Sequence, residues 1–271
     1  VWAFERAKQV SDVSELVQLI QSFRLTHEMI PEQFNADPLV LEALWYDMPL
    51  MAMVRNLARY TRAGVLTPTS KATRHFLKNL QSTKMHLHPF FYLVAMLAYR
   101  KGTSKGDKTH TPVPKIVDAL DSAAIRAFGE VLPIDKKIIM AVDVSGSMHS
   151  AVIDGLGITA AEAAAIMMLI NYKVEPLVVV KQFSSGLSDF PMPTNPTIAT
   201  MLDAMMGASR SWDWRSGTNI SLPFQWAMKQ KEVYDIVIVL TDNETNQGEN
   251  VESAINEYRR KKNPDMKLVV V

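Results

Sequence analysis

The chain has 271 residues, of which 48% are hydrophobic and 21% charged, a composition typical of a globular protein of one large or two modest domains. It contains no cysteine, which excludes disulfides and cysteine-based zinc sites and fits an intracellular protein, so we expect a cytoplasmic location. No apolar run reaches membrane-spanning length and no signal peptide is recognisable, so no membrane partner is expected.

The net charge of +1 conceals a strong asymmetry along the chain. Residues 1–50 carry three Lys or Arg against eight Asp or Glu, a net charge of −5. Residues 51–115 carry twelve Lys or Arg against Asp107 alone, a net charge of +11, and residues 116–271 return to −5. Basic charge confined to one segment is typical of a protein that binds a polyanion, usually a nucleic acid.

The first part of the chain has a helical pattern up to about residue 130. An apolar stripe beginning at Val10 predicts one amphipathic helix, with Ser11 or Ser14 as its N-cap. Prolines separate further predicted helices at about 37–46, 49–63, 69–82, 89–101 and 113–129. Short antiparallel helices joined by short loops favour HEAT-like helical repeats over residues 1–130.

Two of these helices carry wholly basic faces. Arg55, Arg59 and Arg62 recur at helical spacing on one helix, and Lys71, Arg74 and Lys78 recur on the next. Arg100 and Lys101 precede the loop KGTSKGDKTHTP, which is expected to add flexible positive charge. Solvated helix faces normally mix charge signs, so these eight residues are predicted to bind RNA phosphates.

Strands and helices alternate after Pro133. Strands are predicted at about 137–143, 176–183, 187–190 (or a turn), 234–241 and from 266, and helices at about 155–172, 196–207, 219–231 and 249–262. This order predicts a doubly wound α/β domain over residues 134–271. Because a parallel sheet is covered on both faces, we expect at least one more helix after Val271 in the native protein.

Five hydroxyl and carboxylate side chains follow predicted strands or loops of this domain. Asp143, Ser145 and Ser147 lie in DVSGSM, Thr218 lies in SGTN, and Asp242 lies in LTDNET. The loops of parallel strands meet at one edge of the sheet, where these oxygens would suit Mg²⁺, or Mn²⁺, with an open position for an acidic or phosphate oxygen from a partner. Gly146 is expected to permit a backbone conformation that a side chain would resist. The spacing matches the metal-ion-dependent adhesion site of von Willebrand factor A domains.

Several neighbouring side chains have competing interpretations. An ordinary Ser-rich turn after a strand could also produce DVSGS on its own. His149 is a weak additional candidate for the metal site, and His86 and His88 are expected to be structural. Trp212 and Trp214, flanked by arginines just before Thr218, could stack on a nucleotide or on a partner's ring.

Segments from both parts of the chain together resemble the Ro ribonucleoprotein (TROVE-domain) family. They are LTHEMIP at 25–31, MPLMAMVRNLARYTRAGVL at 48–66, HPF at 88–90, VDVSGSM at 142–148 and LTDNET at 240–245. The resemblance implies a ring of HEAT-like repeats, here without its N-terminal part, followed by a von Willebrand factor A domain. It also implies binding of small noncoding Y RNA and of the 3′ ends of misfolded RNAs in RNA quality control, with an exoribonuclease as a possible protein partner.

Two other functions remain open at this point. A metal-dependent protein-binding A domain, serving a AAA+ or chelatase-type machine, would explain the predicted metal site but not the basic block. An enzyme is disfavoured, because DVSGS lacks a second Asp two residues after Asp143 and Ser145 does not lie in a G-x-S-x-G elbow.

Overall fold

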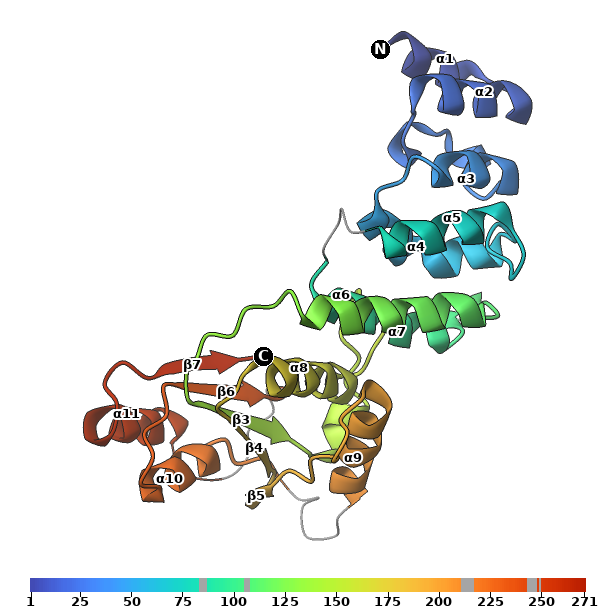
Figure 1. Ribbon diagram of the computed structural model, residues 1–271. Helices are drawn as coiled ribbons and strands as arrows, with labels where there is room; N and C mark the ends of the chain where they lie inside the picture. Colours follow the sequence, from blue (N-terminus) through green and yellow to red (C-terminus); the bar gives the residue numbers. More distant parts are fainter. Residues whose placement is uncertain (83–86, 105–107, 211–216, 243–247, 249) are drawn as a thin grey trace. The chain divides into compact units, whose positions relative to one another are not determined.

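Figure 1 shows the computed structural model of the chain, which describes residues 1–82, 87–104, 108–210, 217–242, 248 and 250–271. The chain divides into two compact units, residues 1–127 and residues 128–271. The boundary predicted near Pro133 lies within a few residues of this division.

The first unit is helical, as its periodicity predicts. Its helices are α1 (Trp2–Gln9), α2 (Val13–Phe23), α3 (Pro38–Trp45), α4 (Leu50–Arg62), α5 (Lys71–Gln81), α6 (Pro89–Arg100) and α7 (Pro114–Phe128), with short 3₁₀ turns at His27–Met29 and Glu32–Phe34. Each of the first four helices packs on the next, and α4 also packs on α6. The sequence pattern did not predict α1.

The helix starts follow side-chain capping chemistry. The predicted cap of α2 was wrong, because the Asp12 carboxylate accepts the Glu15 backbone N–H at 3.1 Å and neither serine caps this helix. Ser70 caps α5 by accepting the backbone N–H of Thr73 at 3.1 Å. His88 Nδ1 accepts the Phe90 N–H at 3.3 Å at the start of α6, which agrees with a structural role for this histidine.

Trp45 joins three helices of the first unit. Its indole is fully buried, with the Tyr60 ring of α4 at 4.6 Å and the Phe76 ring of α5 at 5.9 Å between centroids. Its Nε1–H donates to the Ala72 carbonyl at 3.0 Å. Since a buried indole N–H needs a partner, this bond fixes the end of α3 against the first turn of α5.

The basic loop after α6 contains regular structure. Strands β1 (Thr103–Ser104) and β2 (Lys108–Thr109) form a short antiparallel pair, with Thr103 opposite Thr109. The His110 ring stacks on Tyr99 at 4.9 Å, and its Nε2 lies 3.0 Å from the Tyr99 carbonyl oxygen. Strand pairing and His110 therefore hold the described ends of the loop, and its expected flexible positive charge stays a prediction.

The second unit has the predicted doubly wound α/β fold. Its strands are β3 (Ile138–Asp143), β4 (Val178–Phe183), β5 (Leu187–Asp189), β6 (Ile236–Leu240) and β7 (Lys267–Val270), in the order β5-β4-β3-β6-β7. Strands β3, β4, β6 and β7 are parallel, whereas β5 turns back antiparallel on β4, so the sheet is mixed.

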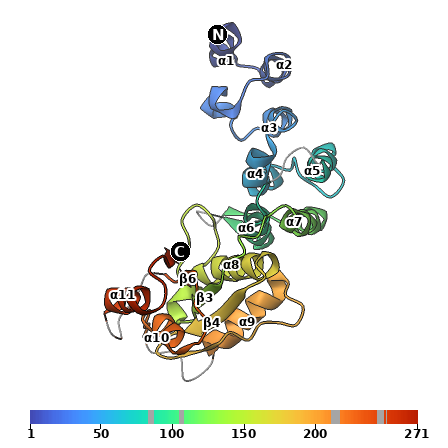
Figure 2. The ribbon, with the colours of Figure 1, turned by 60° about the vertical axis from the view of Figure 1, so that its left-hand side comes forward.

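Helices cover both faces of this sheet, as Figures 1 and 2 show. The helices are α8 (Ala160–Val174), α9 (Ile198–Arg210), α10 (Leu222–Lys229) and α11 (Val251–Lys261), and a 3₁₀ turn, η3 (Gly146–His149), follows β3. Phe224 of α10 and Tyr258 of α11 pack on one face of the sheet against strand residues that include Ile139 and Val237. Helices α8 and α9 pack together over the other face.

Helix α8 begins later than the predicted residue 155. Gly155 and Gly157 have φ values of 78° and 70°, outside the helical region. Thr159 and Glu162 then form a capping box, in which the Thr159 hydroxyl accepts the Glu162 N–H at 3.2 Å and the Glu162 carboxylate accepts the Thr159 N–H at 2.7 Å. This reciprocal pair starts the helix at Ala160.

Strand β7 lies at one edge of the sheet, and the side chain of Val270 is half exposed. The expected continuation past Val271 stays a prediction. Among the described residues, no helix combines the length and the apolar character that crossing a membrane requires.

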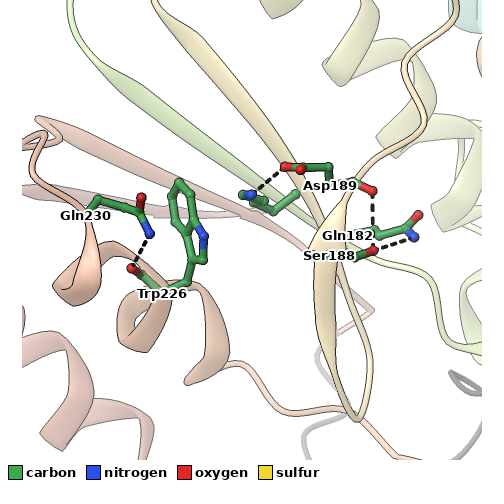
Figure 3. A network of polar contacts seen from close by, with 6 residues as sticks. Gln182, Ser188, Asp189, Trp226 and Gln230 are labelled. Atoms are coloured by element: carbon green, nitrogen blue, oxygen red, sulfur yellow. Dashed lines mark hydrogen bonds and ion pairs between the residues drawn. The ribbon is translucent and has the colours of Figure 1, made fainter.

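A buried lysine fastens edge strand β5 to β4. The Lys181 side chain is 8% exposed, forms an ion pair with Asp189 of β5, and lies 4.0 Å above the centre of the Trp226 ring. On the opposite face, Gln182 Nε2 donates to Ser188 Oγ at 2.9 Å (Figure 3). A buried ammonium is costly without compensation, so the exposed Asp189 and the indole face together make this lysine tolerable.

Replacing one or the other member of the ion pair should therefore have unequal consequences for stability. Asp189→Asn leaves the buried ammonium without a charged partner, and it should lower the free energy of unfolding by roughly 1–2 kcal/mol after allowance for the exposure of Asp189. Lys181→Met removes the buried charge and should change stability by less than about 1 kcal/mol. Urea unfolding followed by circular dichroism measures both, and a larger loss for Lys181→Met would contradict the assignment.

Candidate functional site

Asp143 lies at the carboxyl end of β3 and is completely buried. Its Oδ1 accepts the Ser145 backbone N–H at 2.8 Å, and its Oδ2 accepts the Thr241 hydroxyl at 3.1 Å. Thr241 directly follows β6, which is paired with β3. The carboxylate therefore ties together the loops that follow two neighbouring parallel strands.

The side-chain hydroxyls of Ser145 and Ser147 lie next to each other. Their Oγ atoms are 3.0 Å apart, and Ser145 is buried whereas Ser147 is partly buried. Two ligands at neighbouring corners of an octahedral Mg²⁺ site, each 2.0–2.1 Å from the ion, would be about 2.9 Å apart. The hydroxyl pair therefore already has the spacing of two adjacent ligand positions.

The predicted reason for Gly146 was wrong. Its φ is not positive, and a Cβ built on it would meet no atom within 4 Å. The residue lies in the exposed first position of η3, where the backbone is ordinary. The residue that needs to be glycine is Gly217, because its φ of 89° is unfavourable for other residues and turns the chain just before Thr218.

Thr218 reaches the same edge of the sheet through a loop anchored on Ser184, the residue after β4. The Ser184 hydroxyl donates to the Gly217 carbonyl at 3.0 Å, and the Asn219 N–H donates to the Ser184 carbonyl at 2.9 Å. Thr218 itself is 2% exposed. Since β4 lies beside β3 in the sheet, this anchor holds Thr218 at the strand edge that carries Asp143.

Asp242 follows Thr241 and is partly buried. The loop that it begins meets the Thr218 loop at Gly248, where a Cβ would lie 2.1 Å from Asn219 Oδ1, and the φ of Gly248 is 98°. A side chain cannot be accommodated there without movement. The loops after β3, β4 and β6 are thus connected by Asp143–Thr241, Ser184–Gly217 and Gly248–Asn219.

The electrostatics of this edge favour a cation. Burial raises the pKa of Asp143, hydrogen bonds from Ser145 and Thr241 oppose that rise, and the negative charge of Asp242 adds to it. A cation would offset both the burial and the repulsion between the carboxylates. Within the described residues, no group of three or more His, Cys, Asp or Glu side chains could hold a metal. The oxygen-bearing side chains gathered at this edge are hydroxyls and two carboxylates. This donor set suits hard ions such as Mg²⁺ or Mn²⁺.

His149 ends η3, the 3₁₀ turn that carries Ser147, and contacts α9. Its Nε2 lies 2.6 Å from Ser209 Oγ, which links η3 to α9, and burial lowers the pKa of the imidazole below its usual 6.5. The aromatic pair Trp212 and Trp214 lies outside the described residues, as does His86.

The predicted basic faces lie on the helices of the first unit. Most of the eight candidates are exposed: Arg55, Arg62, Lys71, Arg74, Lys78, Arg100 and Lys101. Arg59 differs, because its Nη2 donates to the Asn35 carbonyl at 2.6 Å and the side chain is only partly exposed. Arg74 Nη1 also donates to a backbone carbonyl, that of Thr69, at 2.5 Å, but its side chain remains exposed.

Three residues that organise this end of the sheet were not singled out from the sequence. Ser184, Thr241 and Asn219 each lie next to a predicted strand end or a predicted ligand. For Ser184 and Thr241, a polar side chain at the end of a predicted strand was the available signal. Their partners lie up to 98 positions away in the chain, and sequence spacing could not identify them.

Comparisons with known proteins agree with both halves of this description. A family model described as the TROVE domain matches residues 21–168, and one described as the Ro60 vWA domain matches residues 137–271. The chain is 32% identical over 274 residues to the RNA-binding protein RO60 of Deinococcus radiodurans, an alignment that covers 98% of this chain and 50% of that protein. It is also 32% identical over 279 residues to the RNA-binding protein RO60 of Caenorhabditis elegans, covering 100% of this chain and 42% of that protein.

A solved structure supports the same relationship. The crystal structure of the Deinococcus radiodurans RO (RSR) protein matches 99% of this chain and 55% of that chain, with a TM-score of 0.83 and 29% identity. The chain spans about half the length of the relatives it matches. With the TROVE model covering more than half of its residues and the Ro60 vWA model covering the α/β unit, the chain belongs to the TROVE-domain family of Ro proteins.

Proposed function

We propose that this chain binds RNA through phosphate contacts on its helical unit, as part of a protein that handles noncoding Y RNA and the 3′ ends of misfolded RNAs. The observation that carries the proposal is the set of exposed cations on α4, α5 and α6, in a family whose relatives are named RNA-binding proteins. Among the described residues, Arg55, Lys71 and Lys78 have no carboxylate within ion-pair distance. Their charges are therefore available for phosphates.

The second unit would contribute a divalent metal site. Ser145, Ser147 and Thr218 would hold Mg²⁺ or Mn²⁺, with Asp143 and Asp242 bound directly or through water. The 3.0 Å separation of the two serine hydroxyls and the buried, partly uncompensated carboxylate of Asp143 support this assignment. A bound ion would supply an open coordination position for an acidic oxygen of a protein partner, such as an exoribonuclease.

This metal edge also favours the second candidate function, a metal-dependent protein-binding module. That function would involve the second unit alone and leaves the exposed cations of the first unit without a role. RNA binding accounts for those cations, and binding rather than catalysis is the activity that the names of the relatives support.

Metal binding can be tested at the serine pair. Ser145→Ala together with Ser147→Ala removes both hydroxyls, and we expect calorimetric Mg²⁺ affinity to fall by at least about 10-fold. Ser253→Ala, at an exposed position on α11, is the matched control and should bind Mg²⁺ as the unaltered protein does. Unchanged Mg²⁺ binding in the double variant would exclude this site.

RNA binding can be tested on the exposed basic faces. Replacing Arg55, Lys71 and Lys78 with Gln should weaken binding to RNAs of different sequence alike and reduce the slope of log affinity against log salt by about 2–3. Arg59 is left unchanged because it holds the Asn35 carbonyl. The control replaces the exposed Lys229, Lys231 and Lys267 of the second unit with Gln, an equal loss of charge. Equal effects of the two triple variants would show that only net charge matters.

The two sites should act separately on structured RNA. Ser147→Ala is expected to fold normally and to keep affinity for a structured RNA within about twofold, because phosphate contacts belong to the helical unit. A gel shift in Mg²⁺ buffer measures this. Loss of structured-RNA binding in a folded Ser147→Ala protein would mean that the ion itself anchors an RNA phosphate.

A further inference from the structure

An aromatic pair lies within the basic face of α5. Tyr46, just after α3, is 38% exposed, and its ring meets the His75 ring edge-on at 5.1 Å between centroids, with an interplanar angle of 74°. His75 follows Arg74 directly and is separated from Lys71 and Lys78 by four and three positions, so it shares their helix face. His75 therefore lies among the exposed cations of α5, and the Tyr46 ring lies against it.

Both rings are held in place by polar contacts at their edges. The Tyr46 hydroxyl donates to Glu42 Oε1 at 3.0 Å, and Asn79 Nδ2 lies 3.0 Å from His75 Nε2. Beneath them, the bond from Trp45 Nε1 to the Ala72 carbonyl fixes the end of α3 against α5. The exposed part of Tyr46 is thus pre-oriented on a rigid base, which reduces the entropy lost when a ligand binds.

The charged side chains near Tyr46 and His75 determine where a phosphate can bind. Lys71, Arg74 and Lys78 attract phosphates, whereas the carboxylate of Glu42 repels them from the side of the tyrosine hydroxyl. An exposed aromatic ring beside a track of cations is the arrangement that proteins use for single-stranded nucleic acids, with bases on the rings and the backbone on the cations.

We propose that the exposed ring of Tyr46, braced edge-on by His75, is a stacking platform for an unpaired nucleobase of RNA, whose flanking phosphates bind Lys71, Arg74 and Lys78. The inference rests on the proposed RNA binding and adds a preference for unpaired bases that phosphate contacts alone do not provide. A base-paired region cannot use the platform, since its bases already stack on their neighbours.

The test compares two fluorescent ten-nucleotide probes of equal charge, oligoadenosine and an abasic ribose-phosphate chain, by anisotropy. The unaltered protein should bind oligoadenosine more tightly than the abasic chain. Tyr46→Ala should lower oligoadenosine affinity by about 5- to 150-fold, the equivalent of ~1–3 kcal/mol of stacking, and leave abasic binding unchanged. Tyr46→Phe, which keeps the ring, should stay within about twofold of the unaltered protein.

Further variants distinguish the possible failures. Tyr46→Leu keeps apolar bulk without a π face and serves as the test if Tyr46→Ala folds poorly. It should show the same selective loss of oligoadenosine affinity. Oligoadenosine affinity that survives both substitutions, while replacing Lys71, Arg74 and Lys78 with Gln weakens both probes, would overturn the stacking platform and leave the proposed function intact. Failure of the unaltered protein to bind either probe would overturn both.

Discussion

The arrangement of the second unit depends on the buried carboxylate of Asp143. A charged group without water must be compensated, and this one accepts hydrogen bonds from the loop that follows β3 and from Thr241 after β6. Those bonds make the carboxylate a connector between two strand ends that are adjacent in the sheet and distant in the chain. They only partly offset its burial, which leaves the strand edge favourable for a cation.

Glycines with positive φ values also bring the loops at this edge of the sheet together. Gly217 and Gly248 adopt positive φ values, and a Cβ at Gly248 would force the Asn219 side chain to move. Ser184 completes the link to β4 through Gly217 and Asn219. Described residues of three separate loops are therefore joined to one another, although they come from distant parts of the chain.

In the helical unit, a small aromatic core supports helix faces that carry like charges. Its buried aromatic residues, centred on Trp45, leave the opposite faces of α4 and α5 free to carry like charges. Such faces repel themselves and are stable only because apolar packing on the other side of each helix outweighs the repulsion. Charge on this unit is then available for a polyanion, and the aromatic residues at its margin are oriented by the same core.

The sequence by itself determined most of the elements and singled out the candidate site residues. Apolar periodicity, capping residues and prolines are local signals, so the repeats, the alternating second half and the motif at Asp143, Thr218 and Asp242 were all predictable. Helix α1 lay outside the recognised stripe, and the start of α8 depended on the Thr159–Glu162 capping box.

Only the tertiary structure decided which polar groups meet. The Thr241 hydroxyl and the Asp143 carboxylate are 98 positions apart, Arg59 turns inward to the Asn35 carbonyl, and β5 reverses to run antiparallel to β4. It also showed that the positive φ values that favour glycine occur at Gly217 and Gly248 and not at Gly146. Each of these outcomes depends on what packs against the residue, and packing partners come from elements that no local pattern connects.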